Sequence, residues 1–281
     1  IYSNSNVGND NPSGGDTFSA FNKDGFEIGA NTRINDASRA FSAWAFKAGG
    51  SPVSISATGA TSVTQSASST TGLSITQFTG PGNNSSTTVT IPHNLGGTPE
   101  FILYKNTSNA WSWLGYHKDA AQGVSDTHTS EIGASRYTLH FNSNTDRQTN
   151  GYINNAGSAQ TGANDSGFIG TPTSTNIIFR PGNSGSTKSQ YYKDYGVIYA
   201  FKGVAGVSKF GYYDGGTSNK TIDLDFFPRL LVIKRINGSA HWMVYDQFRS
   251  GATASGESMW PYLSFNTNET ESSANDDVDL Y

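Results

Sequence analysis

The sequence predicts an all-β protein built from tandem antiparallel β-sandwich domains of a jelly-roll kind. Glycine is abundant, with 32 residues, aromatic residues make up 12% of the chain, and charged residues make up only 14%. Short runs of strand-forming residues alternate with turns rich in Gly, Asn, Ser and Thr, and long helix-forming stretches are missing. A pattern of residue types also recurs at constant spacing, which indicates a repeated domain.

The repeat is clearest in two sets of four residues, each made of a Pro, a Lys, a Trp and a Tyr. Every member of the second set follows its counterpart in the first by 129 residues, which is unexpected for four chance matches. The sets are Pro99, Lys105, Trp113 and Tyr116, and Pro228, Lys234, Trp242 and Tyr245. A further match, Leu139-His-Phe141 with Leu263-Ser-Phe265, has an offset of 124, which predicts a loop of different length before it.

A third, partial copy is indicated near the start of the chain. Gly25-Phe-Glu-Ile-Gly29 resembles Gly167-Phe-Ile-Gly170, and Trp44-Ala-Phe46-Lys47 resembles Tyr199-Ala-Phe201-Lys202. These matches predict a partial repeat (the C-terminal half) at 1–49, a Ser/Thr-rich linker at 50–72, a complete β-sandwich repeat at 73–205 and a partial repeat (the N-terminal half) at 206–281.

Several points of this division stay open. The segment 50–72 is either a linker or a peripheral pair of strands. The two half-copies complement each other, complement a neighbouring subunit, or belong to a longer chain. Alternatively the frame is permuted, and residues 1–49 complete the sandwich that holds residues 73–130. Because the first residue is Ile1 and not Met, we expect a processed chain or an excerpt of a longer one.

The hydrophobic pattern predicts individual strands. Residues 101–105 and 230–233 are short continuous apolar runs, which are typical of central strands buried on both faces. Residues 136–141 alternate between apolar and polar side chains, which indicates a half-buried strand. Turn signals such as Pro81-Gly82 and Asn237-Gly238 separate such runs.

The bulk properties exclude several functional classes. The net charge is −4, so the chain has no basic field for nucleic acid. No run approaches the ~18 apolar residues that would cross a membrane, so we expect no membrane insertion. The chain has no Cys, which excludes thiol catalysis and thiolate metal sites, and which predicts stabilisation by packing or oligomerisation.

The repeated Trp and Tyr residues have two interpretations. Trp113, Tyr116, Trp242 and Tyr245 are either aromatic platforms for sugar rings or core residues of each sandwich. We favour the core, because a residue type present in both copies is more simply explained by their shared fold than by a shared ligand.

Unrepeated residues near the first motif are the better candidates for binding. Trp111 has no aromatic counterpart, because Ala240 occupies the position 129 residues later. His117 and Asp119 lie close to it in sequence and carry polar groups that can bind sugar hydroxyls. The sequence therefore predicts a glycan-binding site at Trp111, His117 and Asp119.

Lys105 and Lys234 each end a predicted buried strand. Each either pairs with a carboxylate, Asp119 or Asp246, or with a polar loop, or covers the core with its stem while its amine reaches water. We favour the last interpretation, because long basic side chains commonly bury their stems in this way.

Metal, cofactor and catalytic chemistry are not expected. The five His residues form no His-x-His or His-x-x-x-His pair, and we expect the acidic stretches at Asp223, Asp225 and 275–279 to be solvated loops and not calcium sites. No Gly-x-Ser-x-Gly element stands out. Paired carboxylates for glycoside cleavage remain an alternative, but we expect no enzyme.

One stretch of the chain resembles a known repeat family. His93-Asn-Leu-Gly96, then Pro99-x-Phe-Ile-Leu-Tyr-Lys105, then Trp113-x-x-Tyr-His117 resembles a repeat domain of tail-fibre and other virion proteins of marine bacteriophages. Gly196-Val-Ile-Tyr-Ala-Phe-Lys202, followed by Val207-Ser-Lys-Phe-Gly211, is similar to that family's junction between repeats. The resemblance covers the chain from about Gly25 onward, apart from the linker and the extreme ends.

The resemblance implies a lectin-like, concanavalin-like β-sandwich on a virus particle, with no catalytic residues to carry over. One departure is that Leu224-Asp-Phe-Phe227 replaces the His-Asn-Leu-Gly element in the second copy.

From these observations we expect a bacteriophage virion structural protein, a tail-fibre or appendage segment that adheres to host-surface glycans. The alternative is a purely structural capsid-decoration, fibre-shaft or extracellular filament module without a ligand. The expected partners are further copies of the chain in a homo-oligomer, with a trimer as one option, other virion proteins, and host surface polysaccharide. The expected location is the surface of the virion.

Overall fold

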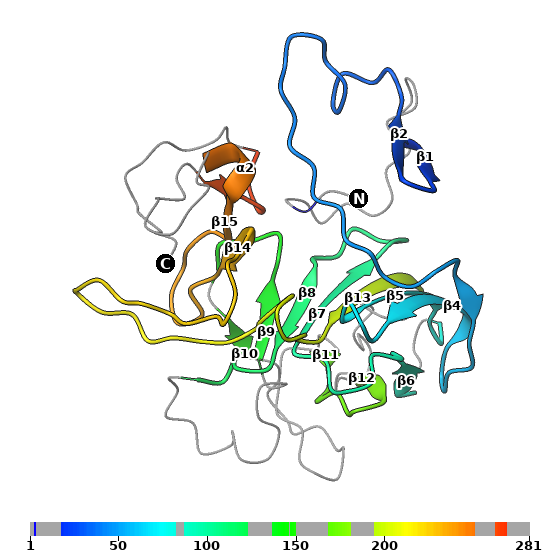
Figure 1. Ribbon diagram of the computed structural model, residues 1–281. Coiled ribbons are helices and arrows are strands. Elements are labelled where there is room, and N and C mark those ends of the chain that lie inside the picture. The colour runs from blue at the N-terminus through cyan, green and yellow to red at the C-terminus, as the bar shows by residue number, and fades with distance from the viewer. Residues whose placement is uncertain are drawn as a thin grey trace. The chain divides into compact units, whose positions relative to one another are not determined.

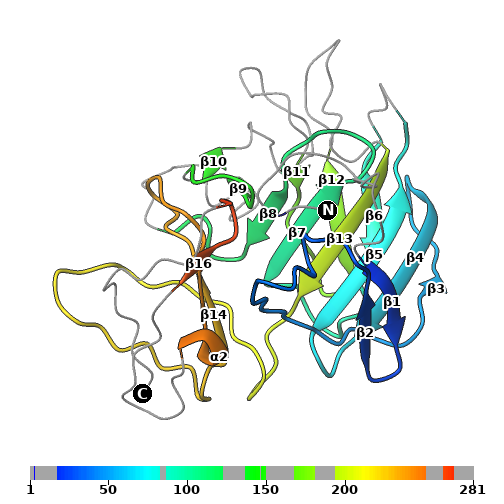
Figure 2. The ribbon, with the colours of Figure 1, turned by 90° about the horizontal axis from the view of Figure 1, so that it is seen from above.

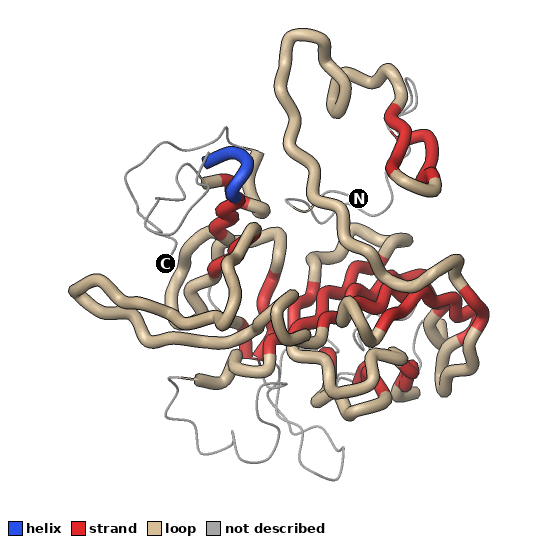
Figure 3. The backbone as a smooth tube through the Cα atoms, viewed as in Figure 1, coloured by secondary structure: helices blue, strands red, loops and turns tan. Residues whose placement is uncertain are grey.

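The computed structural model of the protein describes residues 3, 18–82, 87–122, 137–145, 147–149, 168–180, 194–250 and 262–268. These residues form several antiparallel sheets, so the predicted all-β fold class is confirmed (Figure 1). Within the described residues helix is limited to α2 (Gln247–Ser250), drawn in blue in Figure 3. The chain divides into two compact units, Asn9–Phe46 and a larger unit made of Ile1–Gly8 and Lys47–Tyr281.

The smaller unit contains one β-hairpin. Strands β1 (Phe18–Asn22) and β2 (Gly25–Ile28) pair antiparallel around the turn residues Lys23 and Asp24. Residues 29–46, which follow the hairpin, belong to no strand.

The larger unit is organised around an eight-stranded antiparallel sheet. Figure 2 shows β7, β13, β5 and β4 side by side in it. In spatial order its strands are β10 (Gln148–Thr149), β9 (Tyr137–His140), β8 (Leu114–His117), β7 (Phe101–Asn106), β13 (Tyr195–Phe201), β5 (Leu73–Thr79), β4 (Thr61–Ser68) and β3 (Val53–Ser54).

A second, three-stranded sheet covers one face of the first, which gives the larger unit a β-sandwich core. This sheet has the order β11 (Phe168–Ile169), β12 (Asn176–Arg180) and β6 (Val89–Pro92). Tyr104 on β7 packs edge-on against Phe179 on β12, with the ring centroids 5.0 Å apart. Ile91, Ile102 and Ile198 are buried in the same cluster, so alternate residues of both sheets form the core.

The segment 50–72 is part of this sandwich. β3 pairs with β4, and β4 pairs with β5 at the edge of the large sheet. Val63 and Gln65 on β4 are buried, and the Gln65 amide donates to the Thr76 hydroxyl over 2.9 Å. The segment therefore forms a pair of strands and not a linker, because β3 and β4 are hydrogen-bonded members of the large sheet.

The His93-Asn-Leu-Gly96 element forms a turn after β6. Asn94 and Gly96 have φ angles of 55° and 66°, in the left-handed region. His93 is buried, its Nδ1 accepts from the Leu95 N–H, and its Nε2 therefore donates to the Thr173 carbonyl 3.2 Å away. Burial lowers the pKa of His93, which favours this neutral form.

A third sheet in the larger unit consists of β14 (Leu230–Ile233), β15 (Met243–Asp246) and β16 (Leu263–Ser264). We call β14–β15–β16 the second repeat sheet and β7–β8–β9 the first repeat sheet. The β14–β15 pairing has the same register as the β7–β8 pairing. Adding 129 to both residue numbers of each β7–β8 pair gives a β14–β15 pair. The pairs between β15 and β16 match those between β8 and β9, with the third strand moved by 124 residues.

Polar contacts repeat along with the register. The Trp113 N–H donates to the Asn142 side chain over 3.0 Å, and the Trp242 N–H donates to the Asn266 side chain over 2.9 Å. The internal repeat of the sequence is therefore a repeat of one three-stranded unit with its loop contacts.

Candidate functional site

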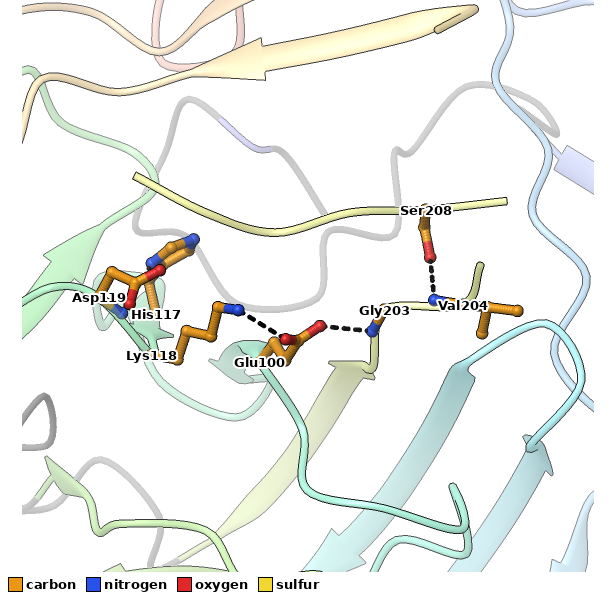
Figure 4. Close-up of polar contacts among 7 residues, drawn as sticks. All are labelled: Glu100, His117, Lys118, Asp119, Gly203, Val204 and Ser208. Atoms are coloured by element: carbon orange, nitrogen blue, oxygen red, sulfur yellow. Dashed lines mark hydrogen bonds and ion pairs between the residues drawn. The ribbon is translucent and has the colours of Figure 1, made fainter. Parts of the chain in front are cut away.

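A cluster of charged side chains lies at the end of the first repeat sheet where β7 begins and β8 ends (Figure 4). The Glu100 carboxylate accepts from Lys118 Nζ and from the Gly203 N–H, each over 2.7 Å. Gly203 follows β13 and begins the segment that leads to the second repeat sheet, where the Ser208 hydroxyl accepts from the Val204 N–H over 3.2 Å. Glu100 therefore fixes this connecting segment to the large sheet.

His117 and Asp119 lie beside this ion pair, as Figure 4 shows. The Asp119 N–H donates to His117 Nδ1 over 3.1 Å. Burial lowers the pKa of His117, while the nearby carboxylates of Asp119 and Glu100 oppose that shift. A neutral imidazole whose Nδ1 accepts from the backbone carries its proton on Nε2, so His117 can donate one hydrogen bond from that atom.

Aromatic rings adjoin the charged cluster. Phe101 lies opposite His117 in the sheet, with the ring centroids 6.2 Å apart. On the same side, Phe210 stacks on Phe101 with centroids 6.0 Å apart and contacts Phe201 at 6.1 Å. The combination of ring faces with carboxylate and imidazole groups is chemically suited to a sugar, whose C–H faces stack on rings and whose hydroxyls take part in hydrogen bonds.

The exposed segment after Phe210 adds a phenol to this neighbourhood. The Tyr212 hydroxyl donates to the Asp214 carboxylate over 2.8 Å. That bond raises the pKa of Tyr212, and the carboxylate of Asp119 acts in the same direction with a smaller effect. Glu100, Phe210 and Tyr212 were missed by the sequence reasoning. The sequence did contain a signal for Glu100. Glu100 and Lys118 are both replaced in the second copy, by Arg229 and Gln247, which indicates that the two positions are in contact.

Trp111 does not belong to this cluster. It lies in the loop that joins β7 to β8, whereas His117 and Asp119 lie at the other end of the same hairpin. A strand advances about 3.3 Å per residue, so β8 separates the two ends by about 10 Å or more. The structure therefore does not bring Trp111 together with His117 and Asp119, because β8 lies between them along the hairpin.

The four repeated aromatic residues are all buried. Trp113 and Trp242 share one hydrophobic cluster with Leu103, Leu139 and Phe141, which we call the tryptophan cluster. Tyr116 and Tyr245 lie on the opposite faces of their sheets, in the sandwich core and in a separate cluster around β14, respectively. All four residues therefore lie in hydrophobic cores, as we favoured. The two Trp residues, however, pack between the repeat sheets and not within one sandwich.

Lys105 corrects another expectation. Its side chain is fully buried, and its amine donates to the Trp111 carbonyl over 2.5 Å instead of reaching water. Lys234 makes the equivalent bond to the Ala240 carbonyl over 2.8 Å. Of the three alternatives for these lysines, pairing with a polar loop is the one that the structure shows for both. Their repeated role is to hold the loop that positions Trp113 or Trp242.

The acidic residues considered for calcium make ordinary polar contacts. Asp225 pairs with Lys209 over 3.0 Å and is exposed, while Asp223 accepts from the Asp225 N–H. Residues 275–279 lie outside the described residues. In the part of the chain that the structure describes, no group of three or more His, Asp or Glu side chains could hold a metal ion. None of the described helical residues forms a segment long and apolar enough to span a bilayer.

Comparison with known families places the whole chain in one family. Residues 1–281 match the model of a domain of unknown function, DUF7483, so the chain belongs to that family. No curated protein matches the chain, and no solved structure matches it.

Proposed function

We propose that this protein is a non-enzymatic structural segment of a bacteriophage tail fibre or similar virion appendage, and that it also adheres to glycans on the host surface. The structural role rests on the repeat and its packing. The adhesive role rests on the mixed aromatic and charged cluster at the end of β8. The resemblance to marine bacteriophage repeat domains supports the location on a virus particle.

One observation carries the structural role. The two repeat sheets turn equivalent faces toward each other across the tryptophan cluster. Phe141 of the first contacts both Trp242 and Phe265 of the second, with centroids 5.0 Å apart in each case. The Trp242 indole N–H also donates to the His140 carbonyl over 3.0 Å. A module that packs its own copies together through apolar faces can extend an appendage by repetition.

The adhesive role fits a weak site that is used many times. His117 lies beside the Phe101 ring, on which Phe210 stacks, and Asp119 is bonded to His117 through its backbone N–H. A few hydrogen bonds and one stacked ring give low affinity, which tandem copies and oligomers would raise through avidity. The alternative without a ligand, a purely structural fibre-shaft or capsid-decoration module, is favoured by the repeat alone.

A glycan array separates these two roles. The intact chain is probed as an oligomer beside Asp119→Ala, Trp111→Ala and the control Asp223→Ala, an exposed carboxylate outside the cluster. We expect a restricted set of glycans to bind the parent chain and the control, and Asp119→Ala to lose most of that signal. If no glycan binds, adhesion is rejected and the purely structural role remains. If Trp111→Ala alone abolishes binding, the site lies at the β7–β8 loop.

The location is tested by labelling. An antibody raised against the chain is applied to purified particles of the phage that encodes it, and the particles are imaged by electron microscopy. Labels along a fibre or appendage are the expected result. Particles that carry no label, with the protein found in the lysate only, would contradict the virion role.

A further inference from the structure

The two repeat sheets differ at one edge. β7 is paired on both sides, with β8 and with β13. Its counterpart β14 pairs with β15, and in the described part of the chain no strand pairs with its other edge. Val232 on β14 is 38% exposed, while the equivalent Leu103 on β7 is 9% exposed. An edge with one apolar side chain exposed is a template for a further strand.

The chain contains a second version of the strand that closes the first repeat sheet. Residues 39–47, Arg-Ala-Phe-Ser-Ala-Trp-Ala-Phe-Lys, align without a gap with residues 194–202, which contain β13. The aligned aromatic positions are Trp44 with Tyr199 and Phe46 with Phe201. In the structure residues 39–47 lie outside every strand, and Phe41 and Phe46 are 52% and 60% exposed.

The sizes of two residues that lie diagonally across from each other on neighbouring strands are exchanged between these versions. Gly196 on β13 has no room for a side chain, because a Cβ there would meet the Tyr104 ring. The residue aligned with Gly196 is Phe41, and the residue that corresponds to Tyr104 on β14 is Ile233. A large residue on β7 thus lies diagonally across from a small one on β13, because Gly196 is directly opposite Asn106 and Tyr104 is opposite Ile198. The same diagonal between β14 and residues 39–47 joins the smaller Ile233 to the large Phe41. The second strand version therefore fits β14 better than it fits β7.

We propose that residues 39–47 of one copy of this chain add to the open edge of β14 in a second copy. The strands would run antiparallel in the register of β13 on β7. That register places Phe46 opposite Leu230, Trp44 opposite Val232 and Ala45 opposite Leu231. Trp44 would then lie against Trp242 as Tyr199 lies against Trp113, whose ring centroids are 6.2 Å apart. Main-chain hydrogen bonds would supply affinity and the aromatic pattern specificity.

Two contacts within the larger unit indicate that the added strand comes from a second copy and not from the same chain. Just after the segment, the Gly49 N–H donates to the Ser66 hydroxyl on β4 over 3.0 Å. The second repeat sheet is anchored at β9, through the bond from Trp242 to His140. β4 and β9 are five strand spacings apart in the sheet, which is about 24 Å. Trp242 also contacts Phe101 on β7, and β7 is three strand spacings, about 14 Å, from β4. The three residues from Gly49 back to Phe46 span only about 10 Å.

Such a contact joins unlike surfaces, the segment 39–47 on one copy and β14 on the next. A head-to-tail contact of this kind leaves a new open site at each end, and it continues into a filament unless the rotation closes a ring. The inference names the partner for the proposed structural role. The contact is tested with the isolated protein, so a negative result would reject the contact without rejecting the proposed location in a fibre.

A disulfide trap tests the pairing, and the chain has no native Cys to interfere. Full-length Ala45→Cys and Leu231→Cys chains are prepared separately, mixed, oxidised mildly and run on a non-reducing gel. Facing residues of an antiparallel pair have Cα atoms about 4.5–5.5 Å apart, within disulfide range, so the mixed dimer should exceed either homodimer by roughly tenfold. Mass spectrometry of the linked peptides identifies the bond.

Ala43→Cys is the matched register control. It lies on the same face two residues away, beyond disulfide range of position 231 in the proposed register, so its mixture with Leu231→Cys should give little mixed dimer. Equal yields from the two mixtures would overturn the register. A double Ala45→Cys/Leu231→Cys chain that cross-links only within itself at low concentration would overturn the choice of a second copy.

The size exchange gives an independent test that adds no Cys near the core. Phe41→Gly should weaken self-association, measured by sedimentation velocity, because it leaves a void over Ile233. Ile233→Tyr should weaken it because the new ring collides with Phe41. The double variant recreates the Gly196 and Tyr104 pair and should recover most of the association. Additive losses in the double variant would overturn the proposed contact.

Discussion

The first and second repeat sheets have the same register but different surroundings. β7 lies in the middle of an eight-stranded sheet with a second sheet over one face, whereas β14 is an edge strand among the residues that the structure describes. The bond from Lys105 to a loop carbonyl and its counterpart from Lys234 are both kept. The repeated residues therefore specify a three-stranded unit with its loop. How far that unit is buried depends on neighbouring elements, which for the first copy are β13 and the β11–β12–β6 sheet.

The faces of the two sheets differ in the same way. Trp113 and Trp242 are buried because the Trp faces of the two copies cover each other, although Val232 on that face of β14 is 38% exposed. On the opposite faces Tyr116 lies in the closed sandwich core, and Tyr245 lies in a small cluster with Leu231, Ile233 and Tyr262. Each repeat therefore has one face completed by the other repeat and one face that needs additional strands.

Removal of the repeated Trp residues should have the largest effect on this arrangement. Trp113→Ala and Trp242→Ala should each lower the free energy of unfolding by about 3–5 kcal/mol, because each leaves a large cavity in the shared cluster. The double variant should cost less than the sum of the two, since both side chains line one cavity. Urea unfolding followed by far-UV circular dichroism measures this. Strict additivity would show that the two copies are not packed together, and exposed Tyr213→Ala is the control.

A smaller effect is expected where the closing strand crosses β7. Gly196→Ala should lower the free energy of unfolding by about 1–3 kcal/mol, because the new methyl group overpacks against the Tyr104 ring. Tyr104→Ile, which copies the residue at Ile233, should relieve part of that loss. Gly211→Ala, where a Cβ would meet nothing within 4 Å, is the matched control. A cost for Gly196→Ala equal to that of the control would contradict the close fit between β13 and β7.

The smallest effect near neutral pH concerns the buried lysine. Burial lowers the pKa of Lys105 from 10.5 to about 8. Between these values the unfolded chain holds a proton that the folded chain has lost, so the free energy of unfolding should rise as the pH rises from about 8 to 10.5. Relative to the parent, Lys105→Met should lack this rise, measured by urea unfolding at several pH values. A parallel pH dependence in parent and variant would show that Lys105 titrates as in water.

The sequence predicted the elements that depend on local pattern. The apolar runs at 101–105 and 230–233 correspond to β7 and β14, and the alternation at 136–141 contains β9. Burial on both faces holds for β7 but not for β14, where Val232 is exposed, and the half-buried pattern of β9 is wrong at Thr138, which is buried. The burial of Trp113 and Trp242 follows from their repetition. The polar loop was an open alternative for Lys105 but not the favoured one, because its partner there, the carbonyl of Trp111, is a backbone group that residue types do not reveal.

The candidate site was predicted only in part. His117 and Asp119 are together, but Trp111 lies at the other end of the hairpin, and Glu100, Phe210 and Tyr212 come from other segments. Sequence distance along β8 could not reveal this, because a hairpin brings its strand ends together and separates them from its turn.

The sequence by itself determined the all-β class, the repeat frame and its constant offset, because these depend on periodicity and residue identity. Only the tertiary structure decided that the repeated Trp faces cover each other and that residues 53–68 extend the sandwich sheet. It also decided that β14, within the described part of the chain, lacks the closing strand that β7 has. The physical reason is that main-chain pairing between distant strands depends on which edges meet, and backbone groups look alike at every position of the sequence.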